Sequence, residues 1–318
     1  MRILVTGGAG FIGSCMVWQL NQLGYTNIII SDELGNDNDK WKNLYGLKFN
    51  DIVDIDEGYD PECDCLIHLG ANTDTTERKN NDILKNNYLY SKYLIDWYVR
   101  KNKRVIYASS AATYGNGSKG FSDETSPLEL RPLNMYAMSK NLLDSWIYNN
   151  GYLDKVVALK YFNVFGPNEY HKKFMTSFIY KIYKTFKETN FTIQLYASND
   201  RKFADGDQVR DFIYVKDAVK ITSFFVNESK ECGIFNVGTG NETTWNTLVD
   251  TVSQVLKIPL KKEYIVPKHD VFKTYQNYTK ADLTKLRKIG CNVEISSLKD
   301  SVSDYINNYL SQNKTIGQ

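Results

Sequence analysis

The chain opens with an apolar strand, a glycine-rich turn and a helix in direct succession. Residues 2–6 (RILVT) form an apolar run, which predicts a buried parallel strand. Gly7, Gly10 and Gly13 follow, and a helical pattern runs from residue 12 to residue 23. Glycines in this context let the backbone approach a pyrophosphate, and the helix N-terminus supplies unpaired N–H groups. This stretch therefore predicts a dinucleotide site.

Apolar runs then alternate with helical patterns, which predicts an α/β fold: a Rossmann-type doubly wound parallel sheet. Strands are expected at 27–31, 64–69, 104–108, 155–162, 212–215, 234–237 and near 262–266. Helices are expected at 79–101, 136–149, 173–188, 218–228 (capped by Asp217), 244–256 and 297–311. We expect residues 1–165 plus about 208–240 to form the dinucleotide-binding domain. Residues of about 166–207 plus 241–318 are expected to form a smaller, mostly C-terminal α+β substrate domain.

Acidic and basic side chains follow the second predicted strand. Asp32 ends it at the distance from the glycine turn where an acid typically accepts hydrogen bonds from the adenosine ribose. Glu33 adds a negative charge that should repel a 2′-phosphate, whereas Lys40 and Lys42 could offset that repulsion. These residues leave the choice between NAD and NADP open.

Tyr136 and Lys140 are spaced for proton transfer, since residues four apart share one face of a helix. The ordinary pKa of tyrosine is about 10, and a neighbouring ammonium lowers it by favouring the phenolate. Such a pair can move a proton on or off a sugar hydroxyl while a cofactor takes or gives the hydride. Ser110 follows the strand at 104–108, and its hydroxyl can hold the reacting group.

Other polar positions lie within or just after apolar segments. Gly70 and Ala71 follow the strand at 64–69 and could let the backbone lie against the cofactor. Asn86 and Asn87 stand in mid-helix, where asparagine is a mediocre helix former, so we expect them to make buried hydrogen bonds. His68 lies inside an apolar strand and is expected to be a core residue rather than a catalytic one.

Charge and cysteine content exclude several classes of partner. The 39 basic and 37 acidic side chains are interspersed and give a net charge of +2, so we expect neither nucleic-acid nor membrane binding. Three histidines and the pattern Cys63–Asp64–Cys65 lack the spacing of a zinc site, so no metal is expected. The five irregularly spaced cysteines fit free thiols. With no signal peptide and no apolar run of ~18 residues, we expect a cytoplasmic protein.

Several of these motifs together resemble the extended short-chain dehydrogenase/reductase family. The resemblance rests on the glycine fingerprint, Ser110, Tyr136-x-x-x-Lys140 and the segment 161–167 (YFNVFGP). Within that family the chain is similar to the ADP-L-glycero-D-manno-heptose 6-epimerases, and this likeness covers nearly its whole length. The motifs that carry it are Gly70–Ala71, 75–77 (TTE), 108–115 (ASSAATYG), Glu169 with His171 and Lys172, and 279–283 (TKADL).

The resemblance implies an isomerase that inverts C6 of ADP-D-glycero-D-manno-heptose by transient oxidation, for lipopolysaccharide core heptose supply. It implies two proton partners on opposite faces of the sugar, by match Tyr136 and Lys172, although from the residues alone Lys172 would be a solvated loop lysine. Lys140 would position the nicotinamide ribose and lower the pKa of Tyr136, and Ser110 would hold the hydroxyl. The implied cofactor is NADP, one per subunit and tightly bound, with NAD left open by Glu33. A homo-oligomer is expected.

The expected site residues form three sets. The catalytic set is Tyr136, Lys172, Lys140 and Ser110. The cofactor set is Gly7, Gly10, Phe11, Ile12, Gly13, Asp32, Glu33, Lys40, Leu69, Gly70, Ala71, Asn86, Lys140 and Val164. The substrate set is Ser110, Asn163, Phe174, Lys181, Tyr196, Arg210 and Tyr275; at Phe174 and Lys181 the chain departs from the small or imidazole groups usual in the family.

Two alternatives remain open. One is another nucleotide-sugar epimerase or reductase of the extended family, similar to a UDP-sugar 4-epimerase, although Lys172 argues against it because one tyrosine base suffices there. The other is a non-catalytic dinucleotide-binding scaffold, which often loses the tyrosine or the lysine that are both present here. A 4,6-dehydratase needs an acid pair beside the serine, where this chain has Ala111, Ala112 and Thr113.

Overall fold

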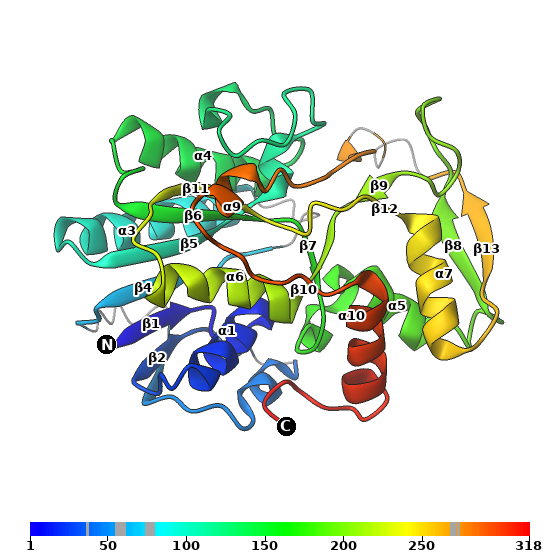
Figure 1. Cartoon of the computed structure of the whole chain (residues 1–318), viewed down its shortest axis with the longest axis horizontal. Helices are drawn as coiled ribbons and strands as arrows, with labels where there is room; N and C mark the ends of the chain where they lie inside the picture. The colour runs from blue at the N-terminus through cyan, green and yellow to red at the C-terminus, as the bar shows by residue number, and fades with distance from the viewer. Residues whose placement is uncertain (36–37, 55–61, 74–79, 268–271, 273) are drawn as a thin grey trace.

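A seven-stranded parallel sheet forms the centre of the computed structural model, which describes residues 1–35, 38–54, 62–73, 80–267, 272 and 274–318 (Figure 1). The strand order is β11-β6-β5-β4-β1-β2-β3. The strands are β1 (Ile3–Thr6), β2 (Ile28–Ser31), β3 (Asp51–Val53), β4 (Cys65–His68), β5 (Arg104–Ser110), β6 (Val156–Tyr161) and β11 (Gly233–Val237). This confirms the predicted doubly wound α/β fold.

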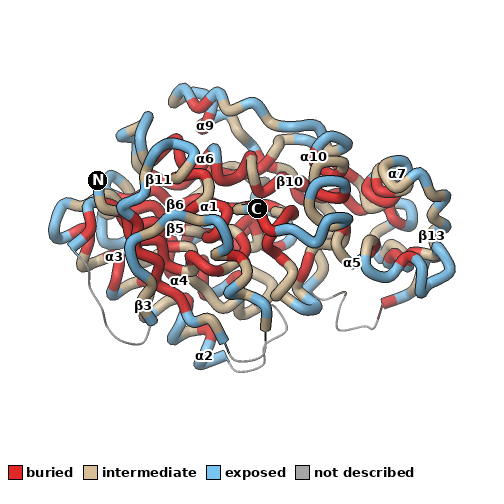
Figure 2. The backbone as a smooth tube through the Cα atoms, turned by 90° about the horizontal axis from the view of Figure 1, so that it is seen from below, coloured by how far each residue is buried: buried red, intermediate tan, exposed pale blue. Residues whose placement is uncertain are grey.

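Helices cover both faces of the sheet, which explains why its strands read as continuous apolar runs. On one face α1 (Phe11–Gln22) and α6 (Val215–Asn227) pack against Ile3 and Val5 of β1. On the other face α3 (Tyr90–Arg100) and α4 (Met135–Asn149) share a core with Leu4. Successive residues of one strand are therefore buried on opposite sides, and Figure 2 shows the buried centre in red.

The sheet topology gathers the predicted site at one edge. β1 pairs with β2 on one side and with β4 on the other, so the strand order reverses at β1. Ligands of such sheets bind beyond the carboxyl ends of the strands at this switch point. The glycine turn leaves the carboxyl end of β1, Gly70 follows β4 and Ser110 ends β5. Segments distant in sequence thus meet at one edge.

The remaining strands form three two-stranded ladders beside this edge. They are β7 (Asn163–Phe165) with β10 (Phe212–Tyr214), β9 (Val209–Arg210) with β12 (Thr243–Thr244), and β8 (Thr192–Tyr196) with β13 (Lys261–Ile265). Three helices lie with these ladders on the right of Figure 1, at the opposite end of the molecule from α3: α5 (Phe178–Thr185), α7 (Trp245–Leu256) and α10 (Leu298–Asp304).

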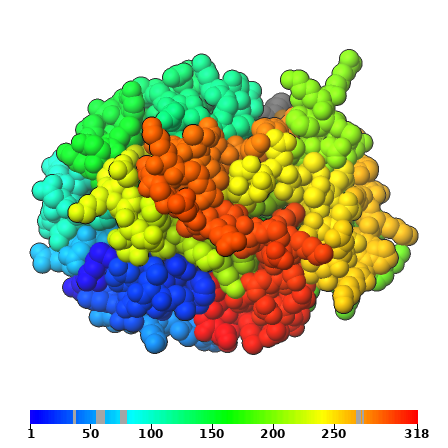
Figure 3. All heavy atoms as spheres, viewed as in Figure 1, coloured from blue at the N-terminus to red at the C-terminus, as the bar shows by residue number. Residues whose placement is uncertain are grey.

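The C-terminal part of the chain contacts several other parts of the fold. Figure 3 shows this part, in orange and red, running across the visible face as far as the blue N-terminal region. It includes α9 (Thr284–Lys288), which packs on β11. Near its end, the Ile316 N–H donates to Asn168 Oδ1 at 2.9 Å. The last residues therefore brace the loop that follows β7.

Three predicted helices differ from the structure. The helix predicted at 173–188 is divided between the end of a 3-10 helix (Tyr170–Met175) and α5. Lys173 adopts a φ of 50°, and Ser177 caps α5 by accepting from the Tyr180 N–H. The helix predicted at 79–101 is α2 (Asn80–Leu84), a π-helical turn at Lys85–Leu89 and then α3. The helix predicted at 297–311 is α10 followed by a π-helical turn at Tyr305–Leu310. Across the described ranges, the helices lack the length and apolarity needed to cross a bilayer.

One prediction around residues 212–217 was wrong. Asp217 does not cap α6, since the cap position is Tyr214. Asp217 instead lies buried in the first turn and accepts from the Ser296 N–H at 2.9 Å. The two strands predicted on either side of α6 are present: β10 pairs with β7, and β11 pairs with β6 in the central sheet.

Candidate active site

Most of the residues predicted to bind the cofactor line one cavity of about 170 Å³ at the edge of the sheet. The predicted residues that line it are Gly7, Gly10, Phe11, Ile12, Gly13, Asp32, Lys40, Leu69, Gly70 and Ala71, and they are joined there by Thr73, His171 and Lys172. Glu33 and Asn86 are exposed and lie outside this lining, as does Val164 on β7. The segment 75–77 of the family motif lies outside the described residues.

The glycine turn is packed so closely that side chains would not fit. Gly7 has a φ of +67°, and a Cβ added there would lie 2.7 Å from Gly70 Cα. A Cβ on Gly13 would lie 2.0 Å from the carbonyl oxygen of Gly7. Gly10 begins α1 without a side-chain cap, so no side chain competes with a phosphate for the first N–H groups of the helix. This cradle fits a dinucleotide pyrophosphate.

Gly13→Ala is expected to weaken dinucleotide binding, because the new methyl group would meet backbone, which cannot move aside as a side chain does. Overpacking of this kind costs about 1–3 kcal/mol, which corresponds to roughly 5- to 150-fold in affinity. The dissociation constant is measured by fluorescence titration, with a thermal melt as the control for folding. If the folded variant bound the dinucleotide with an unchanged dissociation constant, the glycine turn would not be its binding site.

Asp32 and Lys40 form an ion pair at the end of β2. Asp32 Oδ1 lies 2.5 Å from Lys40 Nζ, and Oδ2 accepts from the Ala9 N–H at 2.8 Å. Lys40 Nζ also donates to the backbone carbonyl of Glu33 at 2.8 Å. An adenosine ribose that reaches Asp32 therefore meets a carboxylate and an ammonium together.

Helix α4 presents Tyr136 and Lys140 in its first two turns. Asn134 sets its start, since Asn134 Oδ1 accepts from the Ala137 N–H at 2.9 Å. Lys140 is buried, and its Nζ donates to the carbonyl of Ala108 on β5 at 2.8 Å. Burial lowers the pKa of Lys140 to about 8, while the Asp144 carboxylate acts in the opposite direction.

Tyr136 and Ser110 are brought together, but the predicted electrostatic effect on Tyr136 is wrong in its net direction. Burial raises the pKa of Tyr136 above its ordinary value, and a hydrogen bond with the Ser110 side chain lowers it only in part. The Lys140 ammonium is already engaged by the Ala108 carbonyl. Desolvation, which spacing along a sequence does not reveal, therefore outweighs the helical neighbour.

Of the two mid-helix asparagines, only Asn87 has the predicted buried role. Its Nδ2 donates to the Asn72 carbonyl at 2.8 Å and to Ser139 Oγ at 3.1 Å, and its Oδ1 accepts from the Asn72 N–H. Asn86 is exposed, so its binding of the cofactor stays a prediction. His68 is a core residue as predicted; burial lowers its pKa to about 3.

Lys172 lies in the cofactor cavity, with Nζ 5.3 Å from the centre of the Phe11 ring. Burial lowers the pKa of Lys172, Glu169 raises it, and Lys181 lowers it further. Glu169 is itself buried and accepts from Ser177 Oγ at 2.6 Å and from the Tyr305 hydroxyl at 2.9 Å. Lys172 is thus a desolvated lysine on an anchored loop, and its pairing with Tyr136 across a sugar stays a prediction.

Three of the predicted substrate residues form a cluster. The buried Arg210 guanidinium lies 5.0 Å from the Tyr275 ring centre and 5.5 Å from that of Trp245. Tyr196 packs edge-on against Tyr275, with ring centroids 6.0 Å apart. The guanidinium donates to the Val209 carbonyl at 2.8 Å. This arrangement presents a fixed cation between aromatic rings.

The other predicted substrate residues do not join that cluster. Phe174 is 57% exposed, and Lys181 is exposed on α5 beside Phe178. Asn163 is half-buried on β7, where its N–H donates to the Asp211 carbonyl at 3.0 Å. Their role in substrate binding stays a prediction. Within the described segments, no three histidine, cysteine or acidic side chains meet in a way that could hold a metal ion.

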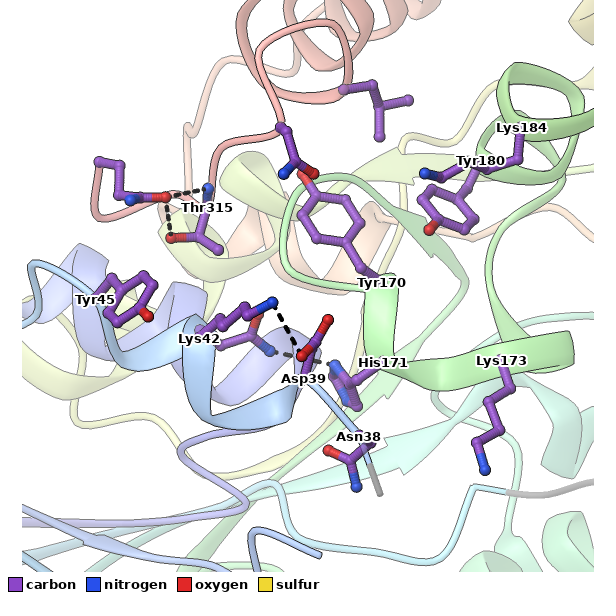
Figure 4. A pocket seen from close by; sticks show the side chains of 14 residues that line it. Asn38, Asp39, Lys42, Tyr45, Tyr170, His171, Lys173, Tyr180, Lys184 and Thr315 are labelled. Carbon is purple, nitrogen blue, oxygen red and sulfur yellow. Dashed lines mark hydrogen bonds and ion pairs between the residues drawn. The ribbon is translucent and has the colours of Figure 1, made fainter. Parts of the chain in front are cut away.

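A larger cavity of about 520 Å³ lies next to the cofactor cavity (Figure 4). It is lined by Lys42, Tyr170, Lys173 and Tyr180 among others, and it shares His171 with the cofactor cavity. Tyr136, Lys140, Ser110 and the glycine turn are not part of it. It is therefore a neighbour of the cofactor cavity and distinct from the glycine cradle.

The chain matches known proteins over nearly its full length. Residues 3–238 match the model of the NAD dependent epimerase/dehydratase family. A protein of Nitratidesulfovibrio vulgaris (strain Hildenborough) named ADP-L-glycero-D-manno-heptose-6-epimerase is 44% identical, over 96% of this chain and 97% of its own. The chain belongs to this epimerase family.

Further similar proteins agree with that assignment. The Fusobacterium nucleatum protein of the same name is 39% identical and covers 98% of each chain. A crystal structure of the Helicobacter pylori ADP-L-glycero-D-manno-heptose-6-epimerase superposes with a TM-score of 0.79 at 25% identity, covering 96% of this chain and 95% of that one. The family supports a nicotinamide cofactor and a nucleotide-sugar substrate for this epimerase fold.

Two features of this family member escaped the sequence reasoning. Asp144 on α4 and Lys160 on β6 form a completely buried ion pair, 2.6 Å apart, beneath the active-site residues. The buried Glu169 anchors the Lys172 loop. One sequence signal for the ion pair was present: Asp144 lies one helical turn beyond Lys140, on the same face of the helix. Glu169 belongs to a motif of the family resemblance, but nothing local marked its anchoring role, since its partner Tyr305 is remote in sequence.

Proposed function

We propose that this enzyme inverts C6 of ADP-D-glycero-D-manno-heptose to give the L-glycero epimer, which would supply the heptose of the lipopolysaccharide core. The observation that carries the proposal is the meeting of Tyr136, Ser110 and Lys140 beside a glycine cradle. The names of the full-length relatives supply the sugar. A nicotinamide bound at the cradle would supply the hydride acceptor and donor.

On one face of the sugar, Tyr136 would take the proton from the C6 hydroxyl as the base. Ser110 supports this role, because its side chain already shares a hydrogen bond with Tyr136 and can hold the substrate hydroxyl in the same plane. Lys140, fixed by the Ala108 carbonyl, would orient the nicotinamide ribose. Oxidation at C6 gives a ketone, which can be reduced from either face.

On the opposite face, Lys172 would exchange the second proton. A desolvated lysine whose pKa is lowered gives up its proton more readily than an ordinary lysine and can then take a proton back as a base. Arg210 suits the diphosphate of the substrate, since a guanidinium binds such oxygens in a bidentate manner. Tyr275 and Tyr196 beside it offer aromatic surface for the nucleotide base.

The proposal is tested by incubating the purified protein with ADP-D-glycero-D-manno-heptose and reading the C6 configuration by proton NMR. Conversion to the L-glycero epimer is expected, together with a nicotinamide cofactor that copurifies. UDP-glucose serves as the competing substrate. Conversion of UDP-glucose with ADP-heptose left untouched would favour a UDP-sugar 4-epimerase instead, and protein without cofactor would favour a scaffold.

We further propose that the bound cofactor is NADP, one per subunit. Lys40 supports this choice, because its ammonium lies where a 2′-phosphate would meet Asp32. Lys40→Ala is expected to weaken NADP binding by about tenfold or more, the equivalent of one charge-assisted hydrogen bond. NAD binding should change little, because Asp32 becomes free to accept from the ribose. Both dissociation constants are measured by fluorescence titration.

Lys42→Ala is the matched control for this prediction. Lys42 is on the same short helix (Lys40–Leu44) but pairs with Asp39 and lines the neighbouring cavity. It should leave both dissociation constants close to those of the wild type. Equal loss of NAD and NADP binding in Lys40→Ala would contradict a 2′-phosphate at this position.

A further inference from the structure

A completely buried ion pair lies directly beneath the active-site residues. Lys160 on β6 and Asp144 on α4 are 1% and 0% exposed, and Lys160 Nζ lies 2.6 Å from Asp144 Oδ2. Ion pairs this deep are costly to desolvate, and well-packed apolar residues are often at least as stabilising. Stability alone therefore does not explain two charges at this position.

Both oxygens of the Asp144 carboxylate accept hydrogen bonds. Oδ1 accepts from the Tyr107 hydroxyl at 2.8 Å, and Oδ2 accepts from Ser109 Oγ at 2.7 Å as well as from Lys160. Tyr107 and Ser109 are both on β5, immediately before Ser110. One carboxylate thus joins helix α4 to two strands of the central sheet.

Lys160 extends these contacts to the segment after Ser110. Its Nζ donates to Thr113 Oγ1 at 2.6 Å, and Thr113 Oγ1 donates in turn to the Ser110 carbonyl at 2.7 Å. Lys160 Nζ also lies 5.2 Å from the centre of the Tyr114 ring. The backbone on both sides of Ser110 is therefore held by the same pair.

Asp144 also follows Tyr136 and Lys140 along one face of α4, each one turn from the next. We propose that Asp144 and Lys160 are positioning residues of the reaction: they hold Tyr136, Lys140 and Ser110 in register, and the Asp144 carboxylate keeps Lys140 in its ammonium form. This inference rests on the proposed function, in which the Lys140 ammonium orients the nicotinamide ribose.

The electrostatic surroundings are consistent with that role. The Asp144 carboxylate raises the pKa of Lys140, which burial has lowered to about 8. Burial and the charge of Lys140 both lower the pKa of the neighbouring His68, which is therefore neutral at working pH. Five titratable groups among the described residues lie around Lys140 and Asp144. They are Tyr136 on α4, His68 on β4, Tyr107 on β5, Lys160 on β6 and Tyr114 in the segment after β5. Asp144 is the anion among them.

The test is the pH at which the holoenzyme releases its nicotinamide cofactor, followed by fluorescence from neutral to alkaline pH. Wild-type protein should release cofactor as Lys140 loses its proton. The double variant Asp144→Asn, Lys160→Met removes both charges and leaves neither unpaired. Its release midpoint should move to lower pH by on the order of one unit, because the anion that favours the ammonium is gone. A merely structural pair would not move this midpoint.

Two single variants keep the inference testable if the double variant fails to fold. Tyr107→Phe removes one donor from Asp144 while keeping the shape, which leaves the carboxylate less neutralised and should move the midpoint to higher pH. Lys160→Arg keeps the charge and should have the midpoint of the wild type. If the double variant folds, an unmoved midpoint in it overturns the inference. If it does not fold, an unmoved midpoint in Tyr107→Phe does so.

The release measurement needs no sugar, so its result is separate from that of the substrate assay. Suppose that the wild type epimerises ADP-heptose and that the variants release cofactor at the same pH as the wild type. The proposed function then stands, and only the role of the Asp144–Lys160 pair is overturned. If wild-type protein shows no pH-dependent release of cofactor, the inference and the assigned role of Lys140 are both overturned. A shifted midpoint without ADP-heptose turnover would reject only the proposed substrate.

Discussion

Replacing Tyr136 by phenylalanine is expected to slow epimerisation about 10³-fold, within the range that a single general acid–base residue contributes. The substitution removes one oxygen atom and leaves the ring in place. The start of α4 should be unaffected, because Asn134 caps it through the Ala137 N–H and not through Tyr136. Cofactor binding should also be unaffected, because the glycine cradle lies on β1 and α1.

The measurement is the initial rate of C6 inversion, with the bound cofactor quantified in the same sample. Tyr148→Phe is the matched control, since Tyr148 is on the same helix but 43% exposed on its far end. Its rate should equal that of the wild type. If Tyr136→Phe turned over the sugar at a near-wild-type rate with cofactor bound, Tyr136 would be rejected as the base.

The parts of the site that follow from local sequence were predictable. The glycine turn is marked by the spacing of its glycines within one strand–turn–helix unit, so it could be found from the sequence. The close approach of Gly70 to Gly7 could not, because Gly70 follows a different strand. Tyr136 and Lys140 both lie on α4, so their relative placement follows from their spacing. The buried strands of the sheet were found for a similar reason, because each is an uninterrupted apolar run.

The parts that depend on burial and on distant partners were not predictable. The pKa of Tyr136 is raised because the fold desolvates it, and no spacing rule contains that information. Asn86 and Asn87 are adjacent, yet only the three-dimensional path of the helix shows which one points inward. The break in the helix predicted at 173–188 arises at Lys173, whose positive φ the apolar periodicity does not reveal.

The same distinction explains why Lys172 needs a functional test. Its loop is held by Glu169, which is bonded to Ser177 and to Tyr305 near the end of the chain. From the sequence pattern, Lys172 is a solvated lysine beside another lysine, whereas in the structure Lys172 is half-buried and Lys173 is exposed. Lys172 lines the cofactor cavity and Lys173 lines the neighbouring one. Because Lys172 and Lys173 are adjacent and chemically identical, substitution of Lys172 tests the mechanism and substitution of Lys173 is its control.

Lys172→Met is expected to lower kcat/KM for epimerisation by about 10²-fold, because one of the two proton partners is lost while the apolar stem is kept. The factor must be the same for both epimers, since a catalyst cannot change their equilibrium. The difference between the two faces should appear instead in a single turnover. The epimer whose hydroxyl faces Tyr136 should still reduce the bound cofactor at a rate near that of the wild type, and the other epimer should not.

The experiment records the absorbance of the reduced nicotinamide after mixing the variant with each epimer separately. Lys173→Met is the matched control and should behave as the wild type in both assays, because Lys173 is exposed outside the cofactor cavity. Equal loss of cofactor reduction with both epimers would mean that Lys172 only helps to bind substrate. Full epimerisation by Lys172→Met would remove it from the mechanism and leave Tyr136 to serve both faces.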